Sequence, residues 1–316
     1  MASPNDRPQP IILDCDPGHD DALAILLALA RPELELLAVT TVAGNAPLSE
    51  TTRNAGSVLA LAGRSDVPLA AGADRPLVRP QSTAAFVHGT SGLDGAALPV
   101  PDAEPRPEGA LALTSVLLET AERPITLVGT GPATNIATLL EARPDLHRRI
   151  AGICLMGGAI GAGNKTASAE FNAWADPEAA ALVLESGLPV TMVGLDVTHQ
   201  ALVPVDRSDR WAELGSRTGA VFADLFRYFA VFHRDRYGWD GSPIHDAVAV
   251  AHVALPALVE TQPYRVDVET SSELTRGRTV VDIEGLSGLP ANAEVGVDID
   301  AERFISVVEK ALASFP

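Results

Sequence analysis

One stretch near the start of the chain, residues 11–30, constrains the fold more than any other. It opens with Ile11-Ile12-Leu13, an apolar run typical of a buried strand, and closes with an apolar helical segment, residues 22–30. Pro17-Gly18 breaks the strand, and four carboxylates flank this break: Asp14, Asp16, Asp20 and Asp21. In an open α/β sheet, ligands bind at the carboxyl ends of the strands. The stretch therefore predicts such a sheet, with a polar site where its first strand ends.

Strand-like and helix-like segments then alternate along most of the chain. The sequence predicts further strands at residues 34–42, 67–71, 125–129, 152–156, 190–195, 264–270 and 278–283. Helical patterns are expected at residues 49–62, 109–121, 177–186, 219–237 and 301–313. This alternation favours βαβ units with a parallel sheet and right-handed crossovers.

We predict a single α/β domain at residues 10–316, with a mainly parallel, Rossmann-like central sheet flanked by helices. Its active site is expected at the strand carboxyl ends. Residues 1–9 are polar and contain proline, which predicts a flexible N-terminal tail. Residues 72–107 lack clear periodicity, and a loop of this length is often functional, for example as a lid.

Composition and charge narrow the classes of partner. The formal net charge of −18 makes nucleic acid and anionic membranes poor partners, because like charges repel. The N-terminus lacks the pattern of a signal peptide, and no apolar run is long enough to span a membrane. We expect a cytoplasmic protein. Cys15 and Cys154 lie in apolar, strand-like runs, which predicts buried free thiols.

Helix capping explains only part of the carboxylate cluster. Asp is favoured at helix N-termini, which accounts for Asp20 or Asp21 but not for Asp14 and Asp16 at the end of an apolar strand. Close carboxylates repel and raise one another's pKa unless they are compensated. A bound divalent cation removes this repulsion, and an all-oxygen ligand set suits Ca²⁺ or Mg²⁺ better than Zn²⁺. The cluster therefore predicts a metal site.

The segment Asp14-Cys15-Asp16-Pro17-Gly18-His19-Asp20-Asp21 resembles the N-terminal signature of the nucleoside hydrolases, the inosine–uridine-preferring ribohydrolase family. Further motifs match this family in order and spacing over nearly the whole chain: His88-Gly89, Asn164, Glu170-Phe171-Asn172, Asp176-Pro177-Glu178, Asp196 with His199, and His245-Asp246. The resemblance implies an enzyme that hydrolyses the N-glycosidic bond of ribonucleosides and releases a free nucleobase and ribose.

The resemblance also implies a metal and its ligands. The ion would be Ca²⁺, held by Asp16, Asp21, Asp246 and the backbone carbonyl of Thr130. Water bound to the metal would attack an oxocarbenium-like ribosyl centre, with Asp16 as general base and Asn45 orienting the water. Asp14 would steady the metal carboxylates from behind.

A second group of residues is expected to bind the sugar. By resemblance, Asp20 and Asn172 bind ribose hydroxyls, and Asn164 and Glu170 bind the 5′ end. Carboxylates and amides suit this task because a hydroxyl both donates and accepts hydrogen bonds. Phe171, inside the same motif, is also predicted to contact the substrate.

The leaving base is expected to lie near two histidines, His245 and His88. In the aromatic region that precedes His245, His233, Tyr237 and Trp239 are predicted to contact the planar base. Phe222, Phe226 and Phe229 follow helical spacing and are predicted to pack in the core. Asp196 and His199 are interpreted as structural.

Two alternatives stay open. An Asp-x-Asp strand end also occurs in Mg²⁺-dependent phosphatases with an aspartyl nucleophile, although no suitably placed Lys is evident. A catalytically silent nucleoside-binding protein is the other reading. The preferred base is not predicted, and the resemblance implies a homodimer or homotetramer.

Overall fold

The computed structural model describes residues 7–316, so most of the predicted tail lies outside the described residues. Of that tail, Gln9 already belongs to the first strand. Two sheets are formed by the strands β1 (Gln9–Cys15), β2 (Leu34–Thr41), β3 (Leu69–Ala71), β4 (Ile125–Gly129), β5 (Ile150–Met156), β6 (Val190–Val193), β7 (Leu202–Pro204), β8 (Gly241–Pro243), β9 (Val259–Val268), β10 (Thr279–Asp282) and β11 (Ala293–Ile299).

The main sheet has nine strands in the order β10-β9-β11-β6-β5-β4-β1-β2-β3. Strands from β11 to β3 pair in parallel, whereas β9 and β10 add an antiparallel edge. The short strands β7 and β8 form a separate antiparallel pair. The mainly parallel α/β sheet predicted from the sequence is therefore confirmed.

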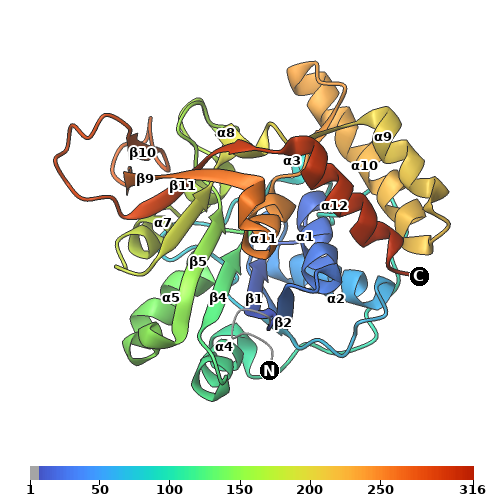
Figure 1. Ribbon diagram of the computed structural model, residues 1–316, viewed down its shortest axis with the longest axis horizontal. Helices are drawn as coiled ribbons and strands as arrows, with labels where there is room; N and C mark the ends of the chain where they lie inside the picture. Colours follow the sequence, from blue (N-terminus) through green and yellow to red (C-terminus); the bar gives the residue numbers. More distant parts are fainter. Residues whose placement is uncertain (1–6) are drawn as a thin grey trace.

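Helices cover both faces of this sheet (Figure 1). One side carries α1 (His19–Ala30), α2 (Leu48–Leu61), α10 (Arg217–Tyr237), α11 (Asp246–Ala254) and α12 (Ala301–Ala313). The other carries α4 (Gly109–Thr120), α5 (Thr134–Ala142) and α7 (Pro177–Leu184). The side chains of β1 alternate between two hydrophobic cores, one on each face of the sheet: Ile11 and Leu13 pack in the first and Ile12 in the second.

Short elements fill the connections. They are the α-helical turns α3 (Ala85–His88), α6 (Phe171–Ala175), α8 (Leu195–Thr198) and α9 (Val205–Asp209), and the 3₁₀ turns η2 (Pro144–Arg149), η3 (Arg210–Leu214) and η4 (Pro256–Leu258). Three of them, α3, α6 and α8, follow the carboxyl ends of parallel strands and contribute residues to the site described below.

Several predicted boundaries were wrong. Helix α1 begins at His19 rather than residue 22, because Gly18 occupies the N-cap position and Asp20 and Asp21 form the first turn. Strand β9 begins at Val259 rather than residue 264, and β11 was missed. Both strands lie at the antiparallel end of the sheet, where exposed residues such as Glu260 and Glu294 interrupt the apolar pattern.

Both thiols are buried and free, as predicted. Cys15 packs in the first core between β1 and α1, and Cys154 lies on β5 facing the same core. Burial raises the pKa of Cys154 to about 12 and that of Cys15 also, so neither is a reactive thiolate at neutral pH.

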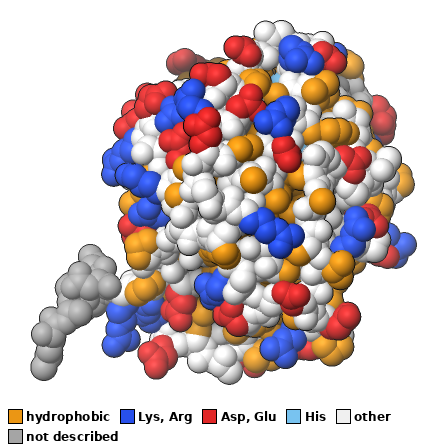
Figure 2. Space-filling model, turned by 90° about the vertical axis from the view of Figure 1, so that its right-hand side faces the viewer, with side chains coloured by type: hydrophobic (Ala, Val, Ile, Leu, Met, Phe, Trp, Pro, Cys, Tyr) orange, Lys and Arg blue, Asp and Glu red, His pale blue; other side chains and the backbone are white. Residues whose placement is uncertain are grey.

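The helical face formed by α9, α10 and α12, at the right of Figure 1, faces the viewer in Figure 2, where acidic and basic side chains are interspersed. Ion pairs tie these elements together: Arg207 of α9 to Glu309 of α12 at 2.8 Å, and Arg227 of α10 to Asp209 at 2.8 Å. Within residues 7–316, no helix combines the length and the apolar character needed to cross a membrane.

Candidate active site

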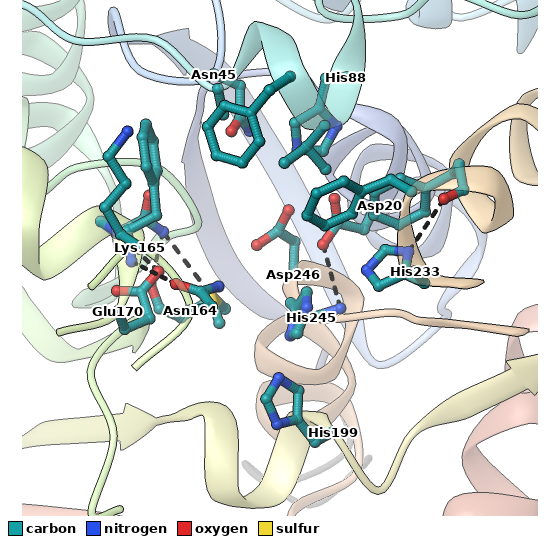
Figure 3. A pocket seen from close by; sticks show the side chains of 18 of the residues that line it. Asp20, Asn45, His88, Asn164, Lys165, Glu170, His199, His233, His245 and Asp246 are labelled. Atoms are coloured by element: carbon teal, nitrogen blue, oxygen red, sulfur yellow. Dashed lines mark hydrogen bonds between the residues drawn. The ribbon is translucent and has the colours of Figure 1, made fainter. Parts of the chain in front are cut away.

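Three aspartates meet where β1 and its neighbouring strands end. Asp20 and Asp21 lie in the first turn of α1, and Asp246 is the first residue of α11, which packs against α1. One carboxylate oxygen from each lies within 4.8 Å of the others. Figure 3 shows Asp20 and Asp246 at the centre of the cavity. The sequence predicted that these residues come together, and the structure brings them together.

Asp21 is the most heavily bonded member of this trio. It accepts hydrogen bonds from the Gly18 amide at 3.0 Å, the Thr130 hydroxyl at 2.8 Å, the Asn45 side chain at 3.2 Å and the Asp16 amide at 3.3 Å. These donors come from the ends of β1, β2 and β4. Asp21 therefore fixes three strand ends around one carboxylate.

Asp16 lies beside the trio rather than in it. Its Oδ2 accepts the Asn45 backbone amide at 2.6 Å, and its Oδ1 is buried and has no hydrogen-bond partner in the described part of the chain. The backbone presses against this carboxylate, since a Cβ at Gly44 would lie 2.0 Å from Asp16 Oδ2. Asp16 is thus held with one carboxylate oxygen unpaired among the described residues, and a bound cation would satisfy that oxygen.

The electrostatics of these four carboxylates are unfavourable in the protein alone. Burial, with neighbouring carboxylates adding to it, raises the pKa of Asp16 and Asp246 well above the ordinary range and that of Asp20 to about 7. Among residues 7–316, no Lys or Arg forms an ion pair with any of them. An oxygen-binding divalent cation fits this donor set.

The side chain of Asp14 has hydrogen-bond partners of its own. It accepts hydrogen bonds from Thr40 and from Asn135 at 2.7 Å, and none from the residues that hold Asp21. Asn135 also donates to the Thr41 carbonyl at 3.0 Å, so Asp14 ties β1 to β2 and α5. Its backbone carbonyl also accepts the amide of Thr130, whose hydroxyl bonds Asp21, at 2.8 Å.

An open cavity lies over the acidic cluster, lined by residues of α3, α6 and α10 among others. Figure 3 shows it with two unlike sides: Asn164, Lys165 and Glu170 face the aspartates from one side, and His88, His233 and His245 from the other. The predicted site residues in the sugar and base groups line this one cavity.

The polar side is built around the turn α6. Glu170 caps it by accepting the amides of Asn172 at 2.8 Å and Ala173 at 3.0 Å, and Asn164 Oδ1 accepts the Phe171 amide at 2.9 Å. Asn172 Nδ2 donates to the Thr130 carbonyl at 2.7 Å. Among the described residues, Asn172 Oδ1 and Asn164 Nδ2 keep no protein partner, which leaves an acceptor and a donor for a ligand.

Histidines dominate the opposite side, and the sequence analysis missed one of them. His199 was interpreted as structural, yet it lines the cavity and packs edge-on against His245 and Trp239. The Nδ1 atom of His245 lies 2.7 Å from the Thr198 hydroxyl. Burial lowers the pKa of His88 and His245 well below the ordinary range and that of His233 to about 4.

A stacked aromatic wall completes this side. The ring of Trp239 is nearly parallel to those of His233, at 4° and 6.1 Å, and Tyr237, at 21° and 4.5 Å. These residues come from the end of α10 and the turn after it. Phe229 packs in the core as predicted, but it also lines the cavity, because α10 borders both.

Lys165 is another residue that the sequence analysis did not assign. Its ammonium lies over the rings of Trp174 at 4.6 Å, Phe86 at 5.1 Å and Phe171 at 5.5 Å, so it joins the polar side to α3 across the cavity rim. Nothing in a Gly-rich loop distinguishes such a Lys from a solvated one. Asp196 accepts the amides of Ile160 and Gly161, which agrees with its structural interpretation.

Comparison with known proteins gives a consistent result. The family model described as inosine-uridine preferring nucleoside hydrolase matches residues 11–306. The pyrimidine-specific ribonucleoside hydrolase RihA of Shewanella sp. (strain ANA-3) is 48% identical over 308 residues, which cover 97% of this chain and 97% of the relative. RihA of Citrobacter koseri is 46% identical over 307 residues, covering 97% and 98%.

Among solved structures, the purine-preferring ribonucleoside hydrolase from Gardnerella vaginalis is similar with a TM-score of 0.91 at 33% identity, over 97% of this chain and 98% of that chain. The fold, the acidic cluster and the cavity lining thus occur in a chain that matches these enzymes along their length. The chain belongs to the inosine-uridine preferring nucleoside hydrolase family.

Proposed function

We propose that this ribonucleoside hydrolase depends on Ca²⁺, held by Asp16, Asp21, Asp246 and the Thr130 carbonyl. The observation that supports this most strongly is a set of buried carboxylates that have no basic partner among residues 7–316; one of them, Asp16, has an oxygen without a hydrogen-bond partner in the same residues. The Thr130 carbonyl accepts one hydrogen bond from Asn172 and has a second lone pair for a ligand. A hard cation with oxygen ligands fits this set better than a cation that prefers nitrogen or sulfur.

When bound, the ion would supply a positive centre that acidifies water and binds ribose hydroxyls. Asp16 is the base in this proposal, because one of its carboxylate oxygens is buried beside the trio without a partner among residues 7–316 and is free to accept a proton. Asn45 is tied to Asp16 and Asp21 through its amide groups, which leaves its Oδ1 atom to orient the attacking water. The cleavage passes through an oxocarbenium-like ribosyl centre.

The sugar is proposed to lie on the polar side of the cavity. Asp20 and Asn172 would bind its 2′ and 3′ hydroxyls, and Asn164 and Glu170 its 5′ end, with Phe171 packed beneath. The unpaired atoms of Asn172 and Asn164 support this assignment, because they face the cavity without protein partners. The base then extends toward His233, Tyr237 and Trp239, whose stacked rings suit a planar group.

The similar RihA proteins are described as pyrimidine-specific, and on that basis we propose pyrimidine ribonucleosides as substrates. A panel of uridine, cytidine, inosine, adenosine and guanosine, assayed with Ca²⁺, tests this. We expect uridine or cytidine to have the highest kcat/KM. Higher kcat/KM for inosine or guanosine would contradict the base preference, and no turnover of any member would contradict hydrolysis itself in favour of a silent binding protein.

His245 is proposed to act on the leaving base. Replacing His245 by Ala should slow uridine hydrolysis by about 10²–10⁴-fold, the usual contribution of a general acid. It should barely affect p-nitrophenyl riboside, whose leaving group departs as a stable anion. Burial keeps His245 neutral in the free site, and negative charge developing on the base would favour its protonated form.

The same two substrates should be tested on His88→Ala, because His88 also faces the base side. Asp16→Ala, in contrast, should disable hydrolysis of both substrates, since attack on the sugar is common to both. If His245→Ala slows both substrates equally, His245 supports the metal site or the fold and its leaving-group role is wrong.

Calcium binding should depend on pH. Burial raises the pKa of Asp20 to about 7, so between the ordinary Asp pKa and that value the metal-free fold binds more protons than the unfolded chain. The cluster therefore destabilises the metal-free fold increasingly as pH rises through this window. Ca²⁺ removes this cost, so its effect on Tm should be larger at about pH 8 than at about pH 5.5.

Differential scanning fluorimetry with and without Ca²⁺ measures this effect. The buried histidines titrate in both samples, so their contribution largely cancels in the difference. An equal Ca²⁺-induced rise in Tm at the two pH values would show that these carboxylates are not the binding groups.

We further propose that residues 10–316 act as one domain, that the chain assembles as a homodimer or homotetramer, and that it works in the cytoplasm. The family resemblance supports the assembly. Light scattering after size-exclusion chromatography measures it directly, and a monomeric mass at assay concentration contradicts it.

A further inference from the structure

The ring of His19 forms a buried link between the loop after α3 and the cavity. It is fully buried and stacks parallel to Phe229, at 5.0 Å and 2°, and to Tyr228, at 5.6 Å and 6°. Its Nε2 atom lies 2.8 Å from the Asp94 carbonyl oxygen, and its Nδ1 atom lies 3.0 Å from Nδ1 of His88. Both ring nitrogens of His19 therefore have a defined partner.

These partners determine where the protons are. A carbonyl oxygen can only accept, so His19 Nε2 carries a hydrogen and donates it to Asp94. The ring is fully buried and stacked between aromatic rings, and such burial disfavours the charged imidazolium, so the ring is neutral. Its Nδ1 atom is then a bare acceptor, and the 3.0 Å contact requires His88 Nδ1 to donate. In neutral His88, this leaves Nε2 without a hydrogen.

A second contact at His88 favours the opposite arrangement. The backbone amide of His19 lies 3.3 Å from His88 Nδ1, and an amide can only donate. Alone, this amide would hold His88 Nδ1 as an acceptor and place the hydrogen on Nε2. The shorter contact, from the His19 side chain, opposes it. The two contacts thus make opposite demands on His88 Nδ1, and the shorter one, at 3.0 Å, comes from the side chain at position 19.

The free atom of this chain of hydrogen bonds belongs to the cavity. His88 lines the cavity, and its Nε2 atom makes no hydrogen bond with any of the residues 7–316. Figure 3 shows His88 and His233 on the same side of the acidic pair. The Nδ1 atom of His233 likewise donates to a carbonyl, that of Phe229 at 3.0 Å, so two acceptors face this side. His245 differs, because its Nδ1 partner is a hydroxyl that is able to donate.

We propose that His19 is a positioning residue that fixes His88 as the Nδ1–H tautomer and thereby presents Nε2 as a hydrogen-bond acceptor to an N–H or O–H group of the nucleoside. The role toward the nucleoside rests on the proposed function, whereas the tautomer does not. The arrangement divides the work between the two histidines: His88 receives a hydrogen bond from the substrate, and the proton donor to the leaving base is His245. His88 is then a specificity residue for ligand donors.

The tautomer is measured directly in the Ca²⁺-loaded protein by long-range ¹H–¹⁵N correlation spectra of ¹⁵N-histidine, with His88→Gln used to assign the His88 signals. In the unchanged chain, we expect Nδ1 of His88 to be protonated and Nε2 to be bare. In His19→Leu, the backbone amide remains and the acceptor is lost, so His88 should change to the Nε2–H form. His19→Asn restores an acceptor oxygen and should restore the original form.

Kinetics give a second readout. His19→Leu should lower kcat/KM for uridine about tenfold, the loss of one hydrogen bond, and His19→Asn should recover most of it. His88→Ala should lower kcat/KM in the unchanged chain but have little further effect on His19→Leu, because coupled residues are not additive. Tyr228→Leu is the matched control, since it removes a ring that stacks on His19 but keeps every hydrogen bond.

An Nε2–H form of His88 in the unchanged chain overturns the proposal, and this result does not depend on any variant folding. A His88 tautomer that is the same in His19→Leu, or that changes in Tyr228→Leu, also overturns it. Because these spectra need no substrate, a protein with the expected tautomers that fails to hydrolyse nucleosides contradicts the proposed function and leaves the role of His19 in setting the tautomer standing.

Discussion

Prolonged chelation should abolish nucleoside hydrolysis, and added Ca²⁺ should restore it. The reason is the set of buried carboxylates of Asp16, Asp20, Asp21 and Asp246, whose burial favours protonation unless a cation compensates them. Without the cation, the groups that should bind water and ribose become protonated or repel one another. The measurement is turnover of uridine by a preparation shown by elemental analysis to be metal-free, before and after Ca²⁺ is added.

Two controls separate loss of the ion from loss of the fold. Circular dichroism of the metal-free preparation shows whether it stays folded. Asp246→Asn should reduce Ca²⁺ content and activity together, whereas Asp196→Asn should leave both unchanged, because Asp196 only caps the loop at Ile160 and Gly161. Full activity in a metal-free sample would exclude the proposed dependence.

The central part of the fold was predictable because it is built from short-range patterns. Apolar strands such as β1 and β4, and the helices that follow them, can be recognised from the pattern of residues. Alternating strands and helices of this kind form a parallel sheet. The antiparallel end was not, since β11 inserts between β6 and β9 and is defined by pairing partners far along the chain. Three-residue strands such as β7 carry too few residues for any pattern.

The site was predictable where a residue type is unusual for its position in the fold. Carboxylates at the end of a buried strand are not explained by helix capping, so Asp14 and Asp16 pointed to a ligand. His199 carried no such signal: a polar residue after a strand is commonplace, and its position on the cavity wall follows from the turn α8 and the packing of Trp239. The link from His19 to His88 joins residues 69 positions apart and is visible only in three dimensions.

Asp14 differs from Asp16 in its partners, and its supporting role at the metal stays a prediction. The alternation of strand side chains places it on the same side of β1 as Asp16, and both were expected near the metal. The structure gives Asp14 the partners Thr40 and Asn135, because it still lies within the sheet whereas Asp16 follows the end of β1. Burial raises the pKa of Asp14 to about 6, and the two hydrogen bonds oppose that shift.

Ribonucleosides should be hydrolysed with a kcat/KM about 10⁴-fold or more above that of their 2′-deoxy counterparts. A site built to bond a hydroxyl rejects a ligand that lacks it, because the buried polar groups are left unpaired. Here those groups are Asp20, which is 4% exposed, and Asn172, which is 8% exposed. Uridine and 2′-deoxyuridine differ only in this hydroxyl, and their kcat/KM values measure the discrimination.

The ratio of the two substrates also assigns the contact to a residue. Asn172→Ala should reduce the preference for uridine over 2′-deoxyuridine. In this variant the enzyme lacks the side chain that bonds the 2′ hydroxyl, so a substrate without that hydroxyl leaves no enzyme group unpaired. Asn164→Ala is the matched control: it should preserve this ratio and instead reduce the preference for uridine over 5′-deoxyuridine, because Asn164 lies on the wall assigned to the 5′ end. Asn172 also holds the Thr130 carbonyl, so Ca²⁺ content must be checked in its variant. Equal kcat/KM for uridine and 2′-deoxyuridine in the unchanged enzyme would mean that the polar side of the cavity does not bind the 2′ hydroxyl.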